Sequence, residues 1–304
     1  MRVENQRRLI LYLTFSFLPV WIPTLIYTAG GGAYESQTMY AILTYSMLCP
    51  AVGMVLTRLI TREGFPMRGK GSLGLRISFC KGKWRYYPAA ILLPTIYLEA
   101  GYGLFYLLFP ESFQPALLQE TGIPKNALWL YPLATCINTC ALSVGALGEE
   151  AGWRGYMMPK LEELFGIRKA VLIGGLIWGI WHYPAIAAGH GYGTGYRGAP
   201  WTGFLVFTLA TVAYGAVMTL LTKKSGSIWP AVFLHAVNNG GGSILGLCFD
   251  GEKLTGLAAQ APVAGLIQEI PLLLIGGIAA AWLCRENQRG TPPVSQEATS
   301  MLRS

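Results

Sequence analysis

Long apolar runs are the feature that most constrains how this chain can fold. A segment of roughly 20 apolar residues can cross a bilayer as one helix. Only 12% of the 304 residues are charged, which is about half the share usual in soluble proteins. The sequence therefore predicts an all-α polytopic membrane protein, with about eight transmembrane helices around an intramembrane cavity. The predicted spans are residues 9–29, 39–57, 88–109, 129–148, 170–188, 202–222, 228–249 and 263–283.

These spans are predicted to form a single membrane domain, residues 1–284. The remaining residues, 285–304, are polar and contain two prolines, and a disordered cytoplasmic tail is expected there. The loop 58–87 mixes apolar and cationic residues, which is typical of a segment that lies on an anionic inner leaflet. Membrane lipids are therefore expected partners.

The distribution of Lys and Arg predicts the orientation. If both termini are cytoplasmic, 20 of the 23 Lys and Arg residues lie on the inner side, and only Lys125, Arg197 and Lys253 lie outside. The net charge of +8 then reflects membrane topology, and no basic soluble domain is visible that would bind nucleic acid. Compact loops and the lack of an organelle signal favour a bacterial cytoplasmic membrane.

Charged residues inside apolar runs are costly and often mark function. The stretch "GALGEEAGWRGYMMPKLEE", residues 145–163, places Glu149, Glu150 and Arg154 at the inner end of a predicted span. On a helix, Glu150 and Arg154 are one turn apart and can pair, whereas Glu149 points about 100° away. Glu149 is therefore the carboxylate better suited to accept a proton. An ordinary ion pair at the membrane surface is the alternative.

Two further predicted spans carry histidines. In "IWGIWHYPA", His182 follows Trp178 by one helical turn, and in "HAVNN", Asn239 follows His235 by the same spacing. His235 and Asn239 would share a helix face and can both donate to one oxygen. His182 can instead be a structural residue that only hydrogen-bonds a neighbouring backbone group.

Three remaining features leave alternatives open. Glu99 lies in the middle of the third predicted span, where it either lines the same cavity or balances a cation. His190 falls in an outer loop and is expected to be solvated. A zinc site built from two histidines and a glutamate is conceivable, but no H-E-x-x-H motif is present, and no cofactor is expected.

The polar residues match three motifs in order, and through them the sequence resembles the CPBP family of intramembrane endopeptidases, which includes CAAX prenyl endopeptidases. Glu149, Glu150 and Arg154 fit E-E-x-x-x-R. Trp178 and His182 fit an aromatic residue followed four places later by His, with Trp where Phe is more usual. His235 and Asn239 fit H-x-x-x-N, so the motif core covers residues 145–240.

The resemblance implies a glutamate-dependent peptidase whose site opens to the cytoplasmic side. Glu149 would activate water with help from His182, and His235 and Asn239 would bind the oxyanion. Glu150 and Arg154 would shape the site. Substrates would be peptides or membrane-protein segments, with lipid modification permitted. The alternatives are a zinc protease, a non-catalytic immunity or binding protein, and a proton-coupled transporter.

Glu149 and His182 can share one site only if the fold brings them to the same depth in the membrane. His182 lies roughly 20 Å along a helix from the cations at its inner end, whereas Glu149 stands near the inner end of its own span. We therefore expect Glu149 to be buried, and residues 152–166 to form an amphipathic helix near the inner surface.

Overall fold

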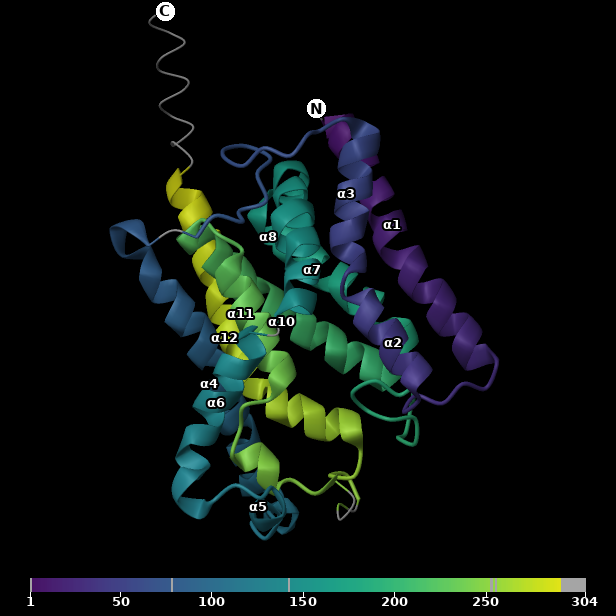
Figure 1. Cartoon of the computed structure of the whole chain (residues 1–304), viewed down its shortest axis with the longest axis vertical. Helices are drawn as coiled ribbons and strands as arrows, with labels where there is room; N and C mark the ends of the chain where they lie inside the picture. The colour runs from purple at the N-terminus through teal and green to yellow at the C-terminus, as the bar shows by residue number, and fades with distance from the viewer. Residues whose placement is uncertain (1, 78, 142, 252–253, 255, 291–304) are drawn as a thin grey trace, which may run out of the picture.

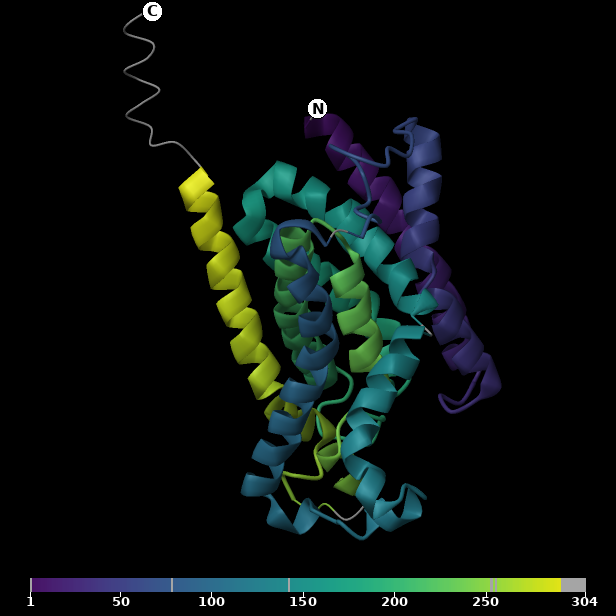
Figure 2. The same cartoon turned by 60° about the vertical axis from the view of Figure 1, so that its left-hand side comes forward.

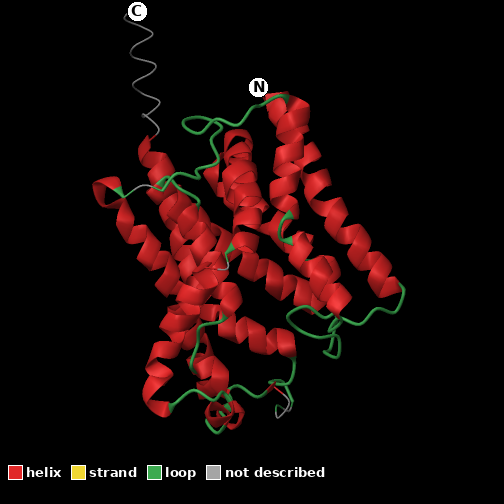
Figure 3. Ribbon diagram, viewed as in Figure 1, coloured by secondary structure: helices red, strands yellow, loops and turns green. Residues whose placement is uncertain are grey.

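The computed structural model describes residues 2–77, 79–141, 143–251, 254 and 256–290, which form helices joined by loops and turns (Figure 3). In these residues, one isolated bridge joins Phe113 and Phe249. The longer elements are α1 (Arg2–Ala29), α2 (Gln37–Ser46), α3 (Cys49–Thr61), α4 (Tyr86–Leu108), α6 (Tyr131–Ala141), α7 (Val144–Gly152), α8 (Met158–Trp181), α10 (Trp201–Ser225), α11 (Trp229–Gly240) and α12 (Ala261–Gly290). The short ones are η1 (Cys80–Arg85), η2 (Pro110–Ser112), α5 (Leu117–Glu120), η3 (Lys125–Leu130), the π-helical turn η4 (Trp153–Met157), α9 (Tyr183–Ala187) and η5 (Leu245–Cys248).

The predicted all-α membrane architecture is confirmed, but the count of eight spans is not. Within the described part of the chain, five helical stretches are long and apolar enough to cross a membrane. A sixth arises if α2 and α3, which meet at a 43° bend, form one broken span. The chain is thus an integral membrane protein with fewer full-length spans than its apolar runs predict.

Further predicted spans besides 39–57 are interrupted in the structure, and the runs 129–148 and 228–249 are clear examples. The run 129–148 is divided among η3, α6 and α7, with α6 ending at Ala141. The run 228–249 becomes α11, which ends at Gly240 and is followed by Gly241 at φ 62°, a value that suits glycine. The 12 residues of α11 extend only about 18 Å, too short for a hydrocarbon core of about 30 Å.

The helices form a bundle in which α10 is central. It packs on α8 and on α12, while α1 packs on α3 and α11 packs on α4. Figures 1 and 2 show α1 with α3 on one flank of the bundle and α12 on the other. The beginning of α1 and the end of α12 lie at the same end of the molecule (Figure 1). This end also carries the basic loop between α3 and α4.

The last helix extends beyond its predicted boundary. α12 continues through residues 285–290, which the sequence assigned to a disordered tail. Near this extension, Glu286 accepts hydrogen bonds from Lys224 and from the Trp282 indole, so polar contacts accompany the extra turns. The remaining tail, residues 291–304, lies outside the described residues.

A fold-back at Gly166 places the two halves of one apolar stretch side by side. The stretch from Val144 to Trp181 is helical except at Gly166, where φ is 74° and ψ is 161°. Residues with a Cβ rarely adopt this backbone conformation, so glycine permits the chain to reverse here. The expected helix over residues 152–166 is present as η4 and the first part of α8.

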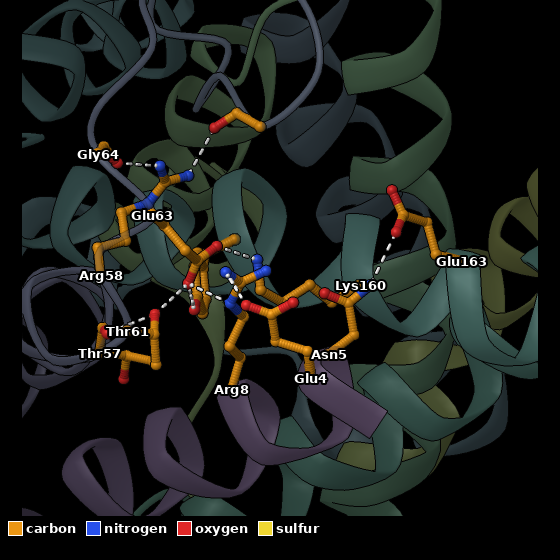
Figure 4. Close-up of polar contacts among 12 residues, drawn as sticks. Glu4, Asn5, Arg8, Thr57, Arg58, Thr61, Glu63, Gly64, Lys160 and Glu163 are labelled. Carbon is orange, nitrogen blue, oxygen red and sulfur yellow. Dashed lines mark hydrogen bonds and ion pairs between the residues drawn. The ribbon is translucent and has the colours of Figure 1, made fainter. Parts of the chain in front are cut away.

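A polar network ties this fold-back to the rest of the basic end (Figure 4). Glu63 accepts hydrogen bonds from Lys160 (2.8 Å) and Tyr156 (2.5 Å), and its carboxylate lies 3.4 Å from Arg8 Nε. Burial alone would raise the pKa of Glu63, but the hydrogen bonds from Lys160 and Tyr156 hold that pKa below its usual value. The carboxylate is therefore held ionised.

A buried arginine anchors the loop above this network. Arg58 was predicted to begin the inner loop, but it lies in α3 and is only 2% exposed. Its guanidinium donates to the Gly64 carbonyl at 2.7 Å and to the Gly71 carbonyl at 2.6 Å (Figure 4). Arg58 therefore holds the loop against the bundle.

Two adjacent glycines in α12 test how tightly the bundle packs. A Cβ at Gly276 would lie 2.6 Å from Ala213 Cα, whereas a Cβ at Gly277 would meet no atom within 4 Å. We expect Gly276→Ala to lower the free energy of unfolding by about 1–3 kcal/mol, because α10 and α12 must separate. Gly277→Ala should lower it far less. Thermal unfolding of both variants in detergent measures the difference, and equal losses would contradict the packing.

Candidate active site

Glu149 is held in the interior by two tryptophans. Its side chain is 2% exposed. Its Oε2 atom accepts hydrogen bonds from the Trp153 indole at 3.1 Å and from the Trp178 indole at 2.9 Å. Oε1 takes part in neither bond and lies 3.9 Å from His235 Nε2. The expected burial of Glu149 is confirmed.

Close packing of α7 positions this carboxylate. A Cβ at Gly148 would lie 2.6 Å from the Met47 carbonyl oxygen, and a Cβ at Gly152 would lie 2.6 Å from the Pro50 carbonyl oxygen. The two glycines therefore let α7 approach the bend between α2 and α3. This contact places Glu149 and Glu150 inside the bundle rather than at its surface.

Glu150 belongs to a buried ionic triad. Its Oε1 atom lies 2.9 Å from His235 Nδ1 and accepts a hydrogen bond from Arg154 at 3.2 Å. Glu150 is fully buried and Arg154 is 5% exposed. The alternative of an ordinary surface ion pair is therefore wrong, since both charges are shielded from solvent.

Trp178 links Glu149 to the Arg154 and His235 side chains that contact Glu150. The Arg154 guanidinium lies over its ring at 4.4 Å from the centroid. On α10, Tyr214 stacks against Trp178 with centroids 5.8 Å apart and planes 12° apart. The His235 ring meets Trp178 edge to face at 5.4 Å. One aromatic ring thus contacts the cation, the imidazole and the carboxylate of this cluster.

His182 lies one helical turn beyond Trp178 and does not contact the carboxylates directly. Its Nδ1 atom is 2.9 Å from the Trp178 carbonyl oxygen, so Nδ1 carries the proton and Nε2 remains an acceptor. The backbone contact expected of a structural histidine is therefore present. His182 also packs on Phe207 with centroids 4.7 Å apart.

His190 is not the freely solvated residue that the sequence predicted. Its ring is half-buried and stacks on His182 with centroids 6.3 Å apart. The Tyr34 hydroxyl lies 2.7 Å from His190 Nδ1. Burial lowers the pKa of His190, so a neutral ring is favoured next to His182. The loop between α9 and α10 folds back over the bundle, and sequence position alone does not reveal this.

Asn239 lies in a cavity beside the buried cluster. It is exposed and stands one turn after His235 on α11. The cavity encloses about 810 Å³ between the α2–α3 bend, α6, α7 and α11. Its lining residues are Thr44, Met47, Leu48, Tyr131, Ala134, Thr135, Asn138, Thr139, Ser143, Val144, Gly145, Ala146, Ala236, Asn239 and Gly240. Asn239 is therefore placed to meet a molecule that enters this cavity.

Glu99 and Asn238 take part in other contacts. Glu99 accepts hydrogen bonds from the backbone amides of Ile244 at 2.6 Å and Leu245 at 3.1 Å. It therefore fixes the chain after α11, a role that neither predicted alternative described. Asn238 accepts a hydrogen bond from the Tyr97 hydroxyl.

Trp153 is the contact that the motifs did not single out. It follows Glu149 by four residues, so helical spacing alone places the two side chains on one face. Its ring is fully buried. The spacing was available in the sequence, but an apolar residue in an apolar run carries no signal of its own.

The cluster also bears on metal binding. Among the residues that the structure describes, no group of three or more His, Cys, Asp or Glu side chains is arranged to hold a metal ion. Zinc sites in proteins use three or four such ligands. Chelation tests the zinc alternative directly.

Comparison with known proteins identifies the region that contains the cluster. Residues 129–241 match the family model of type II CAAX prenyl endopeptidases, Rce1-like. A protein of Methanococcus maripaludis named CAAX prenyl protease 2 is 32% identical over 100 residues, which cover 32% of this chain and 36% of that protein. The alignment therefore spans about a third of the curated relative's length. The region that contains the cluster, residues 129–241, is thus similar to the Rce1-like family of type II CAAX prenyl endopeptidases.

Proposed function

We propose that this protein is an intramembrane endopeptidase that hydrolyses a peptide bond with a water molecule activated by Glu149. One observation carries the proposal. Glu149 is a buried carboxylate with one oxygen held by two indoles and the other facing an imidazole at 3.9 Å. A fixed carboxylate in a site shielded from bulk water is suited to general-base catalysis.

The neighbouring groups provide the remaining chemistry. A doubly protonated His235 donates from Nδ1 to Glu150 and from Nε2 toward the reacting carbonyl. Asn239, one turn away, supplies a second donor for the oxyanion. His182, whose Nε2 is an acceptor, helps to hold the water, and Arg154 positions Glu150 through their buried ion pair.

The substrate is a peptide or a membrane-protein segment, and a lipid-modified peptide is one form of it. The similarity of residues 129–241 to CAAX prenyl endopeptidases supports this class. The cavity that Asn239 lines has room for an extended segment of several residues. We place both termini and the opening of the site on the cytoplasmic side of a bacterial membrane, since the basic loops gather at one end.

Loss of the Asn239 donor tests the oxyanion assignment. We expect Asn239→Ala to lower kcat by about 10²–10³-fold, as for other single oxyanion donors. The exposed side chain makes little contact within the fold, so the unfolding temperature should not change. Asn138→Ala is the matched control, because Asn138 lines the same cavity from α6. Equal activity of the two variants would refute the role of Asn239.

A peptide library incubated with purified protein, with and without a chelator, separates the alternatives. Cleavage that survives chelation supports the metal-free mechanism. Cleavage lost on chelation and restored by zinc identifies a zinc protease. If no peptide is cut, a binding or transport function is favoured, and ligand-dependent thermal stabilisation then becomes the measurement.

A further inference from the structure

We propose that Trp153 and Trp178 form a clamp that positions Glu149 for catalysis. This inference rests on the proposed function, because a base must be oriented toward its water. Both tryptophans act through Glu149, so they are positioning residues and do not themselves touch the reacting atoms.

The convergence of two indoles on one oxygen carries the inference. Trp153 Nε1 and Trp178 Nε1 both donate to Glu149 Oε2, from positions 25 residues apart in the chain. An indole nitrogen is only a donor, so each contact has one possible direction. Hydrogen bonds to an ionised acceptor are stronger than neutral ones. Together they stabilise the anion without placing a cation on it.

The two carboxylates are thereby given different environments. Glu150 pairs with Arg154 and faces His235 Nδ1. Glu149 has two neutral donors on one oxygen, and its other oxygen is left facing His235 Nε2. Direct hydrogen bonding to a cation would weaken a carboxylate as a base. The clamp leaves Glu149 outside the Glu150–Arg154 pair and keeps its Oε1 atom beyond hydrogen-bond distance of His235 Nε2, at 3.9 Å.

Each indole is itself locked in place. Trp178 is held between the Arg154 guanidinium and Tyr214, whose hydroxyl donates to the Leu234 carbonyl at 2.8 Å. Trp153 meets Tyr12 and Trp181 edge to face, with centroids 5.8 Å away in both cases. Rotation of Glu149 would break two hydrogen bonds whose donors cannot follow. The orientation of Oε1 is therefore preorganised.

Other indoles in the described part of the chain have backbone acceptors. Trp181 donates to the Ser16 carbonyl at 2.9 Å, and the half-buried Trp21 donates to the Trp181 carbonyl at 3.2 Å. The half-buried Trp229 donates to the Leu75 carbonyl at 2.7 Å, and its ring packs on Phe233. Because Trp181 packs on Trp153, Trp229 is the better control for loss of a single indole hydrogen bond.

Phenylalanine substitution removes the donor and keeps the ring. We expect Trp178→Phe and Trp153→Phe each to lower kcat by about 10–100-fold, as expected for loss of a hydrogen bond to a charged group, with KM unchanged. Trp229→Phe, which also loses one indole bond, should leave kcat within about twofold. In a Glu149→Gln background, Trp178→Phe should cause no further loss. A fall in kcat that Trp229→Phe reproduces, or a change in KM alone, would overturn the clamp.

A spectrum tests the clamp without turnover. The chain has nine tryptophans, so ¹⁵N-indole labelling gives signals that single Trp→Phe variants can assign. Glu149→Gln should shift the Trp153 and Trp178 signals and leave that of Trp229, which donates to the Leu75 carbonyl, unchanged. Unmoved Trp153 and Trp178 signals refute the clamp even if the protein cleaves peptides. If these signals shift but no peptide is cut, the proposed function fails and the hydrogen bonds stand.

Discussion

Replacing Glu149 with glutamine is expected to lower kcat by about 10²–10⁴-fold, the range that a positioned general base contributes. Glutamine has nearly the same shape, and its carbonyl oxygen can still accept from Trp153 and Trp178. The amide cannot take a proton from water, however. The fold should therefore persist while hydrolysis is lost, as measured by peptide cleavage alongside thermal unfolding.

Glu162→Gln is the control for this substitution. Glu162 pairs with Lys223 at 2.5 Å on the partly exposed side of α8, away from the buried cluster. Its replacement should leave kcat unchanged. If Glu149→Gln retains more than about a tenth of the wild-type kcat, the assignment of Glu149 as the base is wrong.

Removing Arg154 is expected to give the largest loss of stability. Arg154→Met leaves the fully buried Glu150 carboxylate with only His235 as a partner. Breaking one side of a buried ion pair costs about 3–5 kcal/mol, because an uncompensated charge remains in a medium of low polarity. Denaturant unfolding in detergent measures the change.

Lys223→Met provides the comparison, since it breaks an ion pair whose two side chains are 42% and 34% exposed. Such pairs contribute about 0–1 kcal/mol. A second variant, Glu150→Gln, removes the buried charge itself and should recover part of the stability when combined with Arg154→Met. Equal losses from Arg154→Met and Lys223→Met would mean that the triad is not the buried unit described here.

The candidate cluster was largely predictable because its members carry charge in an apolar chain. An ionisable side chain in an apolar span is costly in free energy, and this alone singles out Glu149, Glu150, Arg154 and His235. The structure brings all four together. Asn239 follows His235 by one turn in both the sequence and the structure. Trp153 carries no comparable signal in the sequence, because a buried tryptophan is common. Only the structure shows that its indole donates to Glu149.

The span count was less predictable, since hydropathy measures composition and not continuity. The run 228–249 is apolar throughout, but Gly240 ends the helix after 12 residues. Whereas Gly240 divides one apolar run, the fold-back at Gly166 brings two segments of the chain together. It joins residues that the sequence divided between a span and an inner-surface segment, and it brings Trp178, one turn before His182, into contact with Glu149.

The reversal at Gly166 also makes the site sensitive to register. Glu149 precedes Gly166 by seventeen positions on one limb of the helical hairpin, and Trp178 follows Gly166 by twelve positions on the other limb. One residue added to either limb would turn that limb's contact residue by about 100° and displace it by about 1.5 Å relative to the other limb. The number of residues in this hairpin therefore sets the contact between Glu149 and Trp178. We expect an insertion in the hairpin to reduce peptide cleavage far more than an insertion in the loop before α10.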